Sequence, residues 1–505
     1  MKKEFKVKEE VTDCAPKEFQ DGVLTANNGR GGASGATSGS RWYIVLVSVV
    51  GVVGGFLFGF DTAVISGTID MLKELYHLTG AGVGWFTSVA LIGCIMGTVM
   101  AGKIADQYGR RPALMLSAVL FLASALGCML TPDFKFLVFA RWVGGVGVGL
   151  ASVVEPLYIS EFAPARMRGR LVGMYQLAIV TGILAAYYSN YILLKFSLAS
   201  AATLATSGIW HQVFVSEVWR AMLGAALLPA SVFMLLRFLM PESPRWLIKA
   251  GKENEGLDIL TKIDGAAVAI KELSEIKATL TEKKESIAVL FQPGLRRALL
   301  VGVGLSFFGQ LTGVNIVVYY GPSILRQAGV DLGGTLQYQV MLGVINLVFT
   351  VLAMRFIDRV GRRPLLIGGM IPITLALTVA AVLFLTKSAS PVLLLAILGF
   401  YMACQAFSVC AVVWVLTPEI FPNRVRARGM SIATLTNWSM NAFSAGFFPW
   451  YVAKFGMHVG FFTFAAAALM FSFFIWKFIP ETKGKTLEEI ETLWKPNSPS
   501  LEPGL

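Results

Sequence analysis

Long apolar stretches separated by short polar segments fill the chain from Tyr43 to about residue 479. An apolar stretch of about twenty residues is long enough to cross the hydrocarbon core of a bilayer as a helix. The first six stretches are 43–65, 83–105, 112–130, 135–158, 171–194 and 219–240, and the second six are 296–321, 336–357, 364–386, 391–416, 430–453 and 459–479. The pattern predicts an all-α membrane protein with twelve transmembrane helices.

Composition supports this prediction and excludes a soluble globular protein. Of the 505 residues, 55% are hydrophobic and only 15% are charged, and the mean hydropathy is +0.66. Much of the net charge of +12 lies in the loops GKIADQYGRRP, EFAPARMRGR, DRVGRRP and PNRVRARG, each of which follows an even-numbered span, so all of them lie on the same side of the membrane. By the positive-inside rule these loops and both termini are cytoplasmic. The placement explains the charge without a nucleic-acid partner.

Three charged motifs occur twice in the same order. GKIADQYGRRP returns as MRFIDRVGRRP, EFAPARMRGR as EIFPNRVRARG, and PESPR as PETKG. The repeat predicts two pseudo-symmetric six-helix halves. The predicted domains are a disordered cytoplasmic tail (1–40), the N-terminal half (41–241), a cytoplasmic helical linker (242–290), the C-terminal half (291–482) and a C-terminal tail (483–505).

Parallel halves of this kind imply a transporter whose midplane site opens to each side in turn. We expect the repeated charges to act as a gate when the cytoplasmic side is shut, with Glu161 and Glu419 bridging to arginines of the partner loops. The alternative is that these charges only set the topology. The gate candidates are Arg110, Arg111, Glu161, Asp358, Arg362, Arg363 and Glu419.

Enzyme chemistry has little support in the sequence. The five cysteines show no ligand-like pair spacing and the three histidines are scattered. A nucleophile–base pair and a phosphate-binding loop do not stand out either. We therefore expect a protein that is not an enzyme and that uses no cofactor or metal.

Asp61 lies in the oily stretch GGFLFGFDTAVISG. A charged side chain at the bilayer centre costs at least about 2.5 to 3.5 kcal/mol, so an acid there is a functional candidate. Arg141, about seven residues into span four, lies at roughly 10 Å depth and can pair with it. The alternative is a structural acid satisfied by backbone amides or water. Glu155, farther along span four, favours an interfacial or gate role.

Several motifs together resemble the sugar porter family of the major facilitator superfamily. They are RWVGGVGVGLASVVEPLYISEFAPARMRG, the two GRRP loops, PESPRWL, GQLTGVNIVVYYGP, GVINLVFTVLA and WVLTPEIFPN. The resemblance runs from about Tyr43 to Glu489 and is greatest to bacterial proton-coupled xylose symporters. It implies the major facilitator fold and proton-coupled transport of a hexose or pentose by alternating access. It also implies that Asp61 carries the proton and that Arg141 is its partner.

The same resemblance implies a sugar site made of amides and aromatic rings. Polar groups would bind hydroxyls and flat rings would pack on the apolar sugar face. The implied hydrogen-bonding residues are Gln176, Gln310, Asn315, Asn346 and Asn437. The implied stacking floor is Trp414, the apolar walls are Phe58 and Trp438, and the outer gate is Tyr319 with Tyr320.

Four residues, at three places in the chain, depart from the family pattern. Gly309 replaces the first of two adjacent glutamines, and Cys410–Ala411 replaces a Gly–Pro pair before the tryptophan of span ten, which puts the hinge there in doubt. Asn437 stands where the xylose symporters carry a glutamine. These changes indicate a pocket altered for a different monosaccharide or polyol.

Two other functions stay open. One is a facilitative sugar or polyol uniporter that keeps Asp61 for structure, and the other is a transport-dead sugar sensor. The expected partners are a monosaccharide, a proton and the lipid bilayer. We expect a monomer in the plasma or inner membrane.

Overall fold

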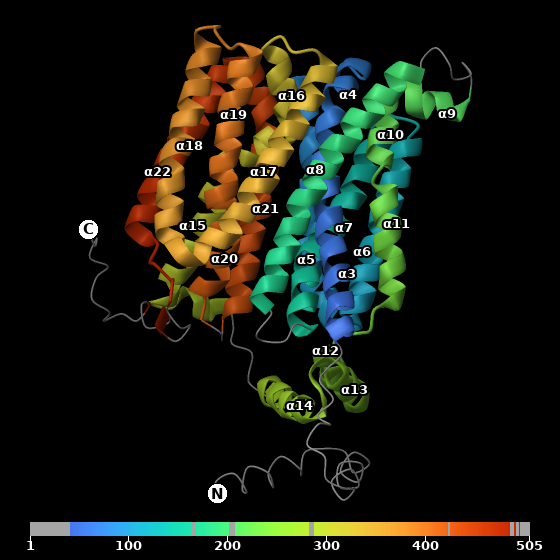
Figure 1. Ribbon diagram of the computed structural model, residues 1–505, viewed down its shortest axis with the longest axis vertical. Helices are drawn as coiled ribbons and strands as arrows, with labels where there is room; N and C mark the ends of the chain where they lie inside the picture. Colours follow the sequence, from blue (N-terminus) through green and yellow to red (C-terminus); the bar gives the residue numbers. More distant parts are fainter. Residues whose placement is uncertain are drawn as a thin grey trace, which may run out of the picture.

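The computed structural model describes residues 41–162, 168–200, 208–281, 287–422, 425–484, 489–490 and 494. Every regular element within these residues is helical. Figure 1 shows the helices of the first half, coloured blue to green, beside those of the second half, coloured yellow to red. The predicted tail 1–40 and most of the predicted tail 483–505 lie outside the described residues.

The first half is a bundle of long helices with short connections. Its elements are α3 (Arg41–Val64), η1 (Ile65–Gly67), α4 (Ile69–Leu75), α5 (Gly80–Tyr108), α6 (Arg110–Leu130), α7 (Phe134–Phe162), α8 (Arg168–Ser200), α9 (Ile209–His211), η2 (Gln212–Ser216), α10 (Val218–Gly224) and α11 (Leu227–Leu239).

The second half repeats this arrangement. Its elements are α15 (Leu295–Leu311), α16 (Val314–Gln327), α17 (Leu332–Val360), α18 (Arg362–Leu385), α19 (Pro391–Gln405), η4 (Ala406–Cys410), α20 (Ala411–Ile420), α21 (Arg426–Phe455) and α22 (Met457–Phe478).

Between the halves, the chain forms short helices beside one end of the bundle. These are α12 (Pro244–Lys249), α13 (Glu253–Asp264), α14 (Ala266–Thr281) and η3 (Ile287–Phe291). The first three share a small apolar core built from Ile248, Leu257, Leu260, Ala269 and Leu273. Figure 1 places α12–α14 below the bundle, and we call that end the linker end and the opposite one the far end.

Ten helices of the described residues are long and apolar enough to span a membrane, and α3 with η1 forms an eleventh span that bends by 45° into α4. The remaining long helix, α21, is 30 residues long and carries Thr436, Asn437, Asn441 and Ser444 within its sequence. Because of these polar residues, α21 is not among the ten apolar helices. These twelve spans agree with the number predicted from sequence.

Three predicted spans are interrupted within their length. Span six breaks between α10 and α11. Span seven breaks between α15 and α16, where Gly313 has a φ of +87° in the left-handed region that favours glycine. Span ten contains the π-helical turn η4 directly before α20. This turn ends at Cys410, where this chain lacks the Gly–Pro pair of the family pattern. The helix is therefore interrupted there by π-helical hydrogen bonding.

Glycines allow the helices to approach closely, as is usual in membrane bundles. A Cβ on Gly59 of α3 would lie 1.9 Å from the Ile179 carbonyl oxygen of α8. The halves meet in the same way, because a Cβ on Gly84 of α5 would lie 1.9 Å from the Gly446 carbonyl oxygen of α21. Contact between α8 and α17 joins the halves along the other side.

Candidate functional site

An acid and a base form an ion pair inside the first half. Arg141 Nη1, on α7, donates to Asp61 Oδ1, on α3, at 3.1 Å. Both side chains are buried, and Arg141 Nε has no hydrogen-bond partner among the described residues. The structure thus brings together the two residues that the sequence analysis paired. They share a single hydrogen bond, which loss of the carboxylate charge would weaken.

The helix that carries Asp61 also contacts the second half. Phe58 lies one turn before Asp61 on α3, and its ring centroid is 5.6 Å from that of Trp438 on α21. Trp438 directly follows Asn437. The Phe58–Trp438 contact therefore connects the helix of the ion pair to the helix that carries a predicted sugar contact.

Two predicted sugar-binding amides flank the break in span seven. Asn315 Nδ2 donates to Gln310 Oε1 at 2.6 Å, and both side chains are half-buried. The Tyr401 hydroxyl donates to the Thr312 carbonyl at 2.8 Å, which satisfies one carbonyl group freed by the break. The broken backbone thus positions a pair of amide side chains on adjoining helix ends.

The remaining predicted sugar contacts have no hydrogen-bond partner among the described residues. Gln176 on α8 is half-buried, while Asn346 on α17 and Asn437 on α21 are buried. Their amide atoms are not fully buried atoms without a hydrogen-bond partner. Trp414 on α20 is 45% exposed. These side chains are available to bind hydroxyl groups and a ring face, although hydrogen bonds do not link them to one another.

The two predicted gate tyrosines are buried on α16 and contact α21. The Tyr320 hydroxyl donates to the Ala445 carbonyl at 2.7 Å. Tyr319 and Asn441 exchange hydrogen bonds, with the Asn441 Nδ2 atom 3.2 Å from the Tyr319 hydroxyl. Both tyrosines therefore hold α16 against α21 in this conformation.

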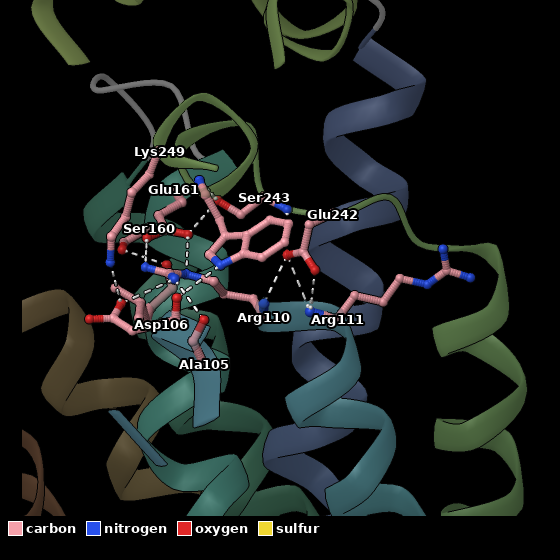
Figure 2. Close-up of polar contacts among 11 residues, drawn as sticks. Ala105, Asp106, Arg110, Arg111, Ser160, Glu161, Glu242, Ser243 and Lys249 are labelled. Atoms are coloured by element: carbon pink, nitrogen blue, oxygen red, sulfur yellow. Dashed lines mark hydrogen bonds and ion pairs between the residues drawn. The ribbon is translucent and has the colours of Figure 1, made fainter. Parts of the chain in front are cut away.

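At the linker end, Figure 2 shows a cluster of charges around Arg110. Arg110 donates to both oxygens of Glu161, from Nε at 3.0 Å and from Nη2 at 2.8 Å, and contacts Asp106 at 3.3 Å. Ser243 also donates to Glu161. Glu242 accepts a hydrogen bond of 2.8 Å from the Arg110 backbone N–H. The cluster fastens the starts of α6 and α12 to the end of α7.

Burial raises the pKa of Glu242, whereas backbone N–H groups of Ser243, Arg110 and Arg111 and the nearby Arg110 charge act in the opposite direction. Arg111 turns away from the cluster. Its guanidinium donates to the carbonyls of Arg237 and Phe238, at the end of α11. A cation is favourable there because the carbonyl groups of a helix end carry partial negative charge.

The second half repeats the cluster residue for residue. Arg362 pairs with Glu419 at 3.1 Å and with Asp358 at 3.0 Å. Glu481 accepts from the backbone N–H groups of Arg362 and Arg363, at 3.1 and 3.0 Å. The Arg363 guanidinium donates to the Trp476 carbonyl, as Arg111 does on α11. Glu161 and Glu419 thus pair within their own halves in this conformation.

One buried ion pair was missed by sequence reasoning. Arg237 Nη2, on α11, lies 2.6 and 2.7 Å from the two oxygens of Glu155, on α7. Glu155 is fully buried, and a Cβ on Gly54 would lie 2.7 Å from its Cδ. Glu155 is thus buried inside the first half near the linker end of α7, and its interfacial or gate role stays a prediction. The signal was available, since Arg237 is a charge within a predicted span.

Comparison with known proteins gives the same picture over nearly the whole chain. The family model "Sugar (and other) transporter" matches residues 47–494. The arabinose-proton symporter of Bacillus subtilis is 38% identical over 458 residues, covering 90% of this chain and 96% of that protein. The D-xylose-proton symporter of Escherichia coli is 37% identical over 489 residues, with the same coverage.

Solved structures of the xylose transporter XylE from E. coli have the same fold. A partially occluded inward-open form matches with a TM-score of 0.76 at 35% identity, covering 88% of this chain and 100% of that one. A form bound to 6-bromo-6-deoxy-D-glucose matches with a TM-score of 0.74 at 36% identity, covering 90% and 99%. In that second structure XylE is described as a proton:xylose symporter of the major facilitator superfamily.

Proposed function

This chain belongs to the family of sugar (and other) transporters, and we propose that it is a proton-coupled monosaccharide symporter that works by alternating access. The observation that carries the proposal is the buried ion pair of Asp61 and Arg141. A carboxylate held in a membrane by one cation binds a proton at the cost of that pairing. The symporters of arabinose and xylose at 37–38% identity support the same function.

In the proposed cycle, ionised Asp61 pairs with Arg141, and a proton from outside neutralises the carboxylate. The freed Arg141 charge is then buried without its counter-ion, which is unfavourable and drives α3 and α7 to a new arrangement. Phe58 transmits the change to Trp438 across the halves. Sugar binds, and the loaded carrier turns inward.

The proposed sugar site lies among the amides and rings of both halves. Gln176 comes from the first half, and Asn346 and Asn437 from the second; all three lack partners among the described residues. Gln310 and Asn315 complete the hydrogen-bonding set, with Trp414 as the stacking ring. Their hydrogen-bonding groups match those of sugar hydroxyls, which donate and accept at once.

We place the linker end in the cytoplasm and the far end outside. The cationic loops at Arg110 and Arg362 lie at the linker end, which is the positive-inside arrangement. At the far end α5 contacts α21 and α16 contacts α4 across the halves, which supports a far side that is closed in this conformation. Glu161 and Glu419 are then proposed to bridge the halves when the cytoplasmic side shuts.

The departures at Gly309 and at Cys410–Ala411 lead us to test a panel of substrates. A Cβ on Gly309 would meet only Val409 and Val413, each at 3.9 Å, so the missing side chain is not forced by packing. The panel includes pentoses, hexoses, deoxyhexoses and polyols.

The test is sugar-induced proton uptake by the full chain in proteoliposomes, with Asp61→Asn as the variant. A sugar that alkalinises the outer medium in the native chain, but not in Asp61→Asn, supports symport. Asp331→Asn is the matched control, because Asp331 caps α17 through Gly334 N–H and Asn caps a helix equally well. Sugar uptake without proton flux, unchanged by Asp61→Asn, would establish a uniporter instead.

A further inference from the structure

A cluster of polar side chains joins the two halves at the far end, away from the sugar and proton sites. The Ser323 hydroxyl, on α16, donates to Asp70 Oδ1, on α4, at 2.7 Å. Arg326, one turn farther along α16, donates from Nη2 to Glu74 Oε1 at 2.7 Å. Its Nη1 atom lies 3.8 Å from Asp70 Oδ2. We call these four residues the far-end latch.

The four residues of the far-end latch differ in how far their side chains are exposed to water. The Glu74 side chain is 66% exposed and that of Arg326 is 42% exposed, so water screens this pair. The Asp70 side chain is only 12% exposed, and its Oδ2 atom has no hydrogen-bond partner among the described residues. Asp70 therefore depends on Ser323 and Arg326 of the other half for compensation of its charge.

The latch lies on a part of span seven where the helical hydrogen-bond pattern is interrupted twice. The first interruption is the break at Gly313, and the second is Pro322, which leaves the Val318 carbonyl without its helical N–H donor. Gln339 Nε2 and the Tyr187 hydroxyl both lie 3.2 Å from that carbonyl oxygen and satisfy it. Because side chains and not a backbone N–H satisfy the Val318 carbonyl, α16 can change its direction at Pro322 without breaking a helical hydrogen bond there.

We propose that Asp70 and Arg326 are gating residues, and that their ion pair, with the Ser323–Asp70 hydrogen bond, holds the far side shut until the carrier opens there. This inference rests on the proposed function, because a carrier must open its far side in every cycle. The strength of the latch then sets the ratio of the two conformations. Without it, the outward-open population grows, and sugar offered at the far side binds with a lower apparent KM.

The test measures how often the far side opens, with Ser88→Cys as a reporter in a full chain whose five native cysteines are replaced. Ser88 is 6% exposed and lies against Gly446 across the halves, so a membrane-impermeant maleimide reaches it only when the far side opens. We expect Arg326→Gln and Asp70→Asn each to raise the labelling rate about threefold or more. Arg326→Lys, which keeps the charge, is expected to restore most of the native rate.

Glu217→Gln is the matched control for the labelling. Glu217 pairs with Arg220 at 2.5 Å at the start of α10, within the first half, so its loss breaks an ion pair without touching the gate. Its labelling rate is expected to equal that of the parent. In parallel, the uptake KM at the far side should fall by about the labelling factor in Arg326→Gln.

The two proposals fail in different ways. If Arg326→Gln and Asp70→Asn are both labelled at the rate of the parent, the proposed gating role of the latch is wrong, even where sugar uptake is normal. Arg326 is partly exposed, so Arg326→Gln remains informative where Asp70→Asn misfolds. Raised labelling in a chain that shows no proton flux with any sugar would retain the latch and overturn symport.

Discussion

Arg237 and Glu155 form a charge pair that water cannot reach. Their side chains are 1% and 0% exposed, and Arg237 lies 4.4 Å from the Phe233 ring centroid. Arg237 Nε and Nη1 have no partner among the described residues. A buried pair of this kind adds little net stability, although removing one member leaves the other uncompensated.

We therefore expect Glu155→Leu and Arg237→Met each to destabilise the protein by about 3 to 5 kcal/mol. The double variant Glu155→Leu/Arg237→Met removes both charges and is expected to recover most of that loss. Thermal unfolding of the detergent-purified chain, followed by fluorescence, measures the effect. A double variant as unstable as the singles would show that the pair does more than balance charge.

At the residue scale, sequence reasoning paired Asp61 with Arg141, and the structure contains that ion pair. It also singled out the doubled GRRP arginines, which pair with Glu161 and Glu419 within their own halves, and the roles of all these residues stay predictions. Arg237 was missed because its partner is 82 residues away in the chain, and no local spacing connects the two. Asp70 and Arg326 were missed because they lie just beyond predicted spans one and seven, where charges resemble an ordinary solvated surface, and only the contact between the halves distinguishes them.

At the scale of helices, the seam between α5 and α21 joins the halves at the far end. Glycine is required at Gly84 because a Cβ there would lie 1.9 Å from the Gly446 carbonyl oxygen. Closure of the far end thus depends on the absence of a side chain at this position. The sequence shows that glycines are frequent in the spans, but it does not show which of them lie at the contact between α5 and α21.

A side chain at Gly84 is expected to keep the far end from closing. Gly84→Val should abolish sugar uptake in proteoliposomes while the purified protein still binds labelled sugar, because the outward-open state retains the site. Gly102→Val is the control on the same helix, where nothing lies within 4 Å of an added Cβ. Native uptake by Gly84→Val would show that the seam need not close.

Sequence patterns were more reliable for entire helices than for their breaks. The number of spans and the family predicted from motifs are confirmed. The break at Gly313 in span seven was not located from the sequence, and the turn at Ala406–Cys410 lies in span ten, whose hinge the sequence had left in doubt. Both interruptions lie inside apolar runs, where hydropathy cannot distinguish a straight helix from a broken one.

At the scale of the whole molecule, the repeated clusters make each half a self-contained body at the linker end. Glu161 and Arg110 in one half, and Glu419 and Arg362 in the other, tie together segments far apart in sequence. In this conformation these contacts stay within each half, and under the proposed cycle Glu161 and Glu419 exchange partners only when the cytoplasmic side shuts. The far-end contacts do cross, so that end must change when the carrier turns.

The charge distribution of the whole molecule also predicts its orientation. The cationic loops GKIADQYGRRP and DRVGRRP lie at the linker end, whereas at the far end Arg220 and Arg326 are matched by Glu217 and by Glu74 with Asp70. In a chain without Cys14, Lys252→Cys in the linker should react with an impermeant maleimide only in inverted vesicles. Lys387→Cys, with the same charge change in a far-end loop, should react in intact cells. The reverse pattern would place the linker outside and would invert the proposed direction of proton entry, because the positive-inside rule would then fail for this chain.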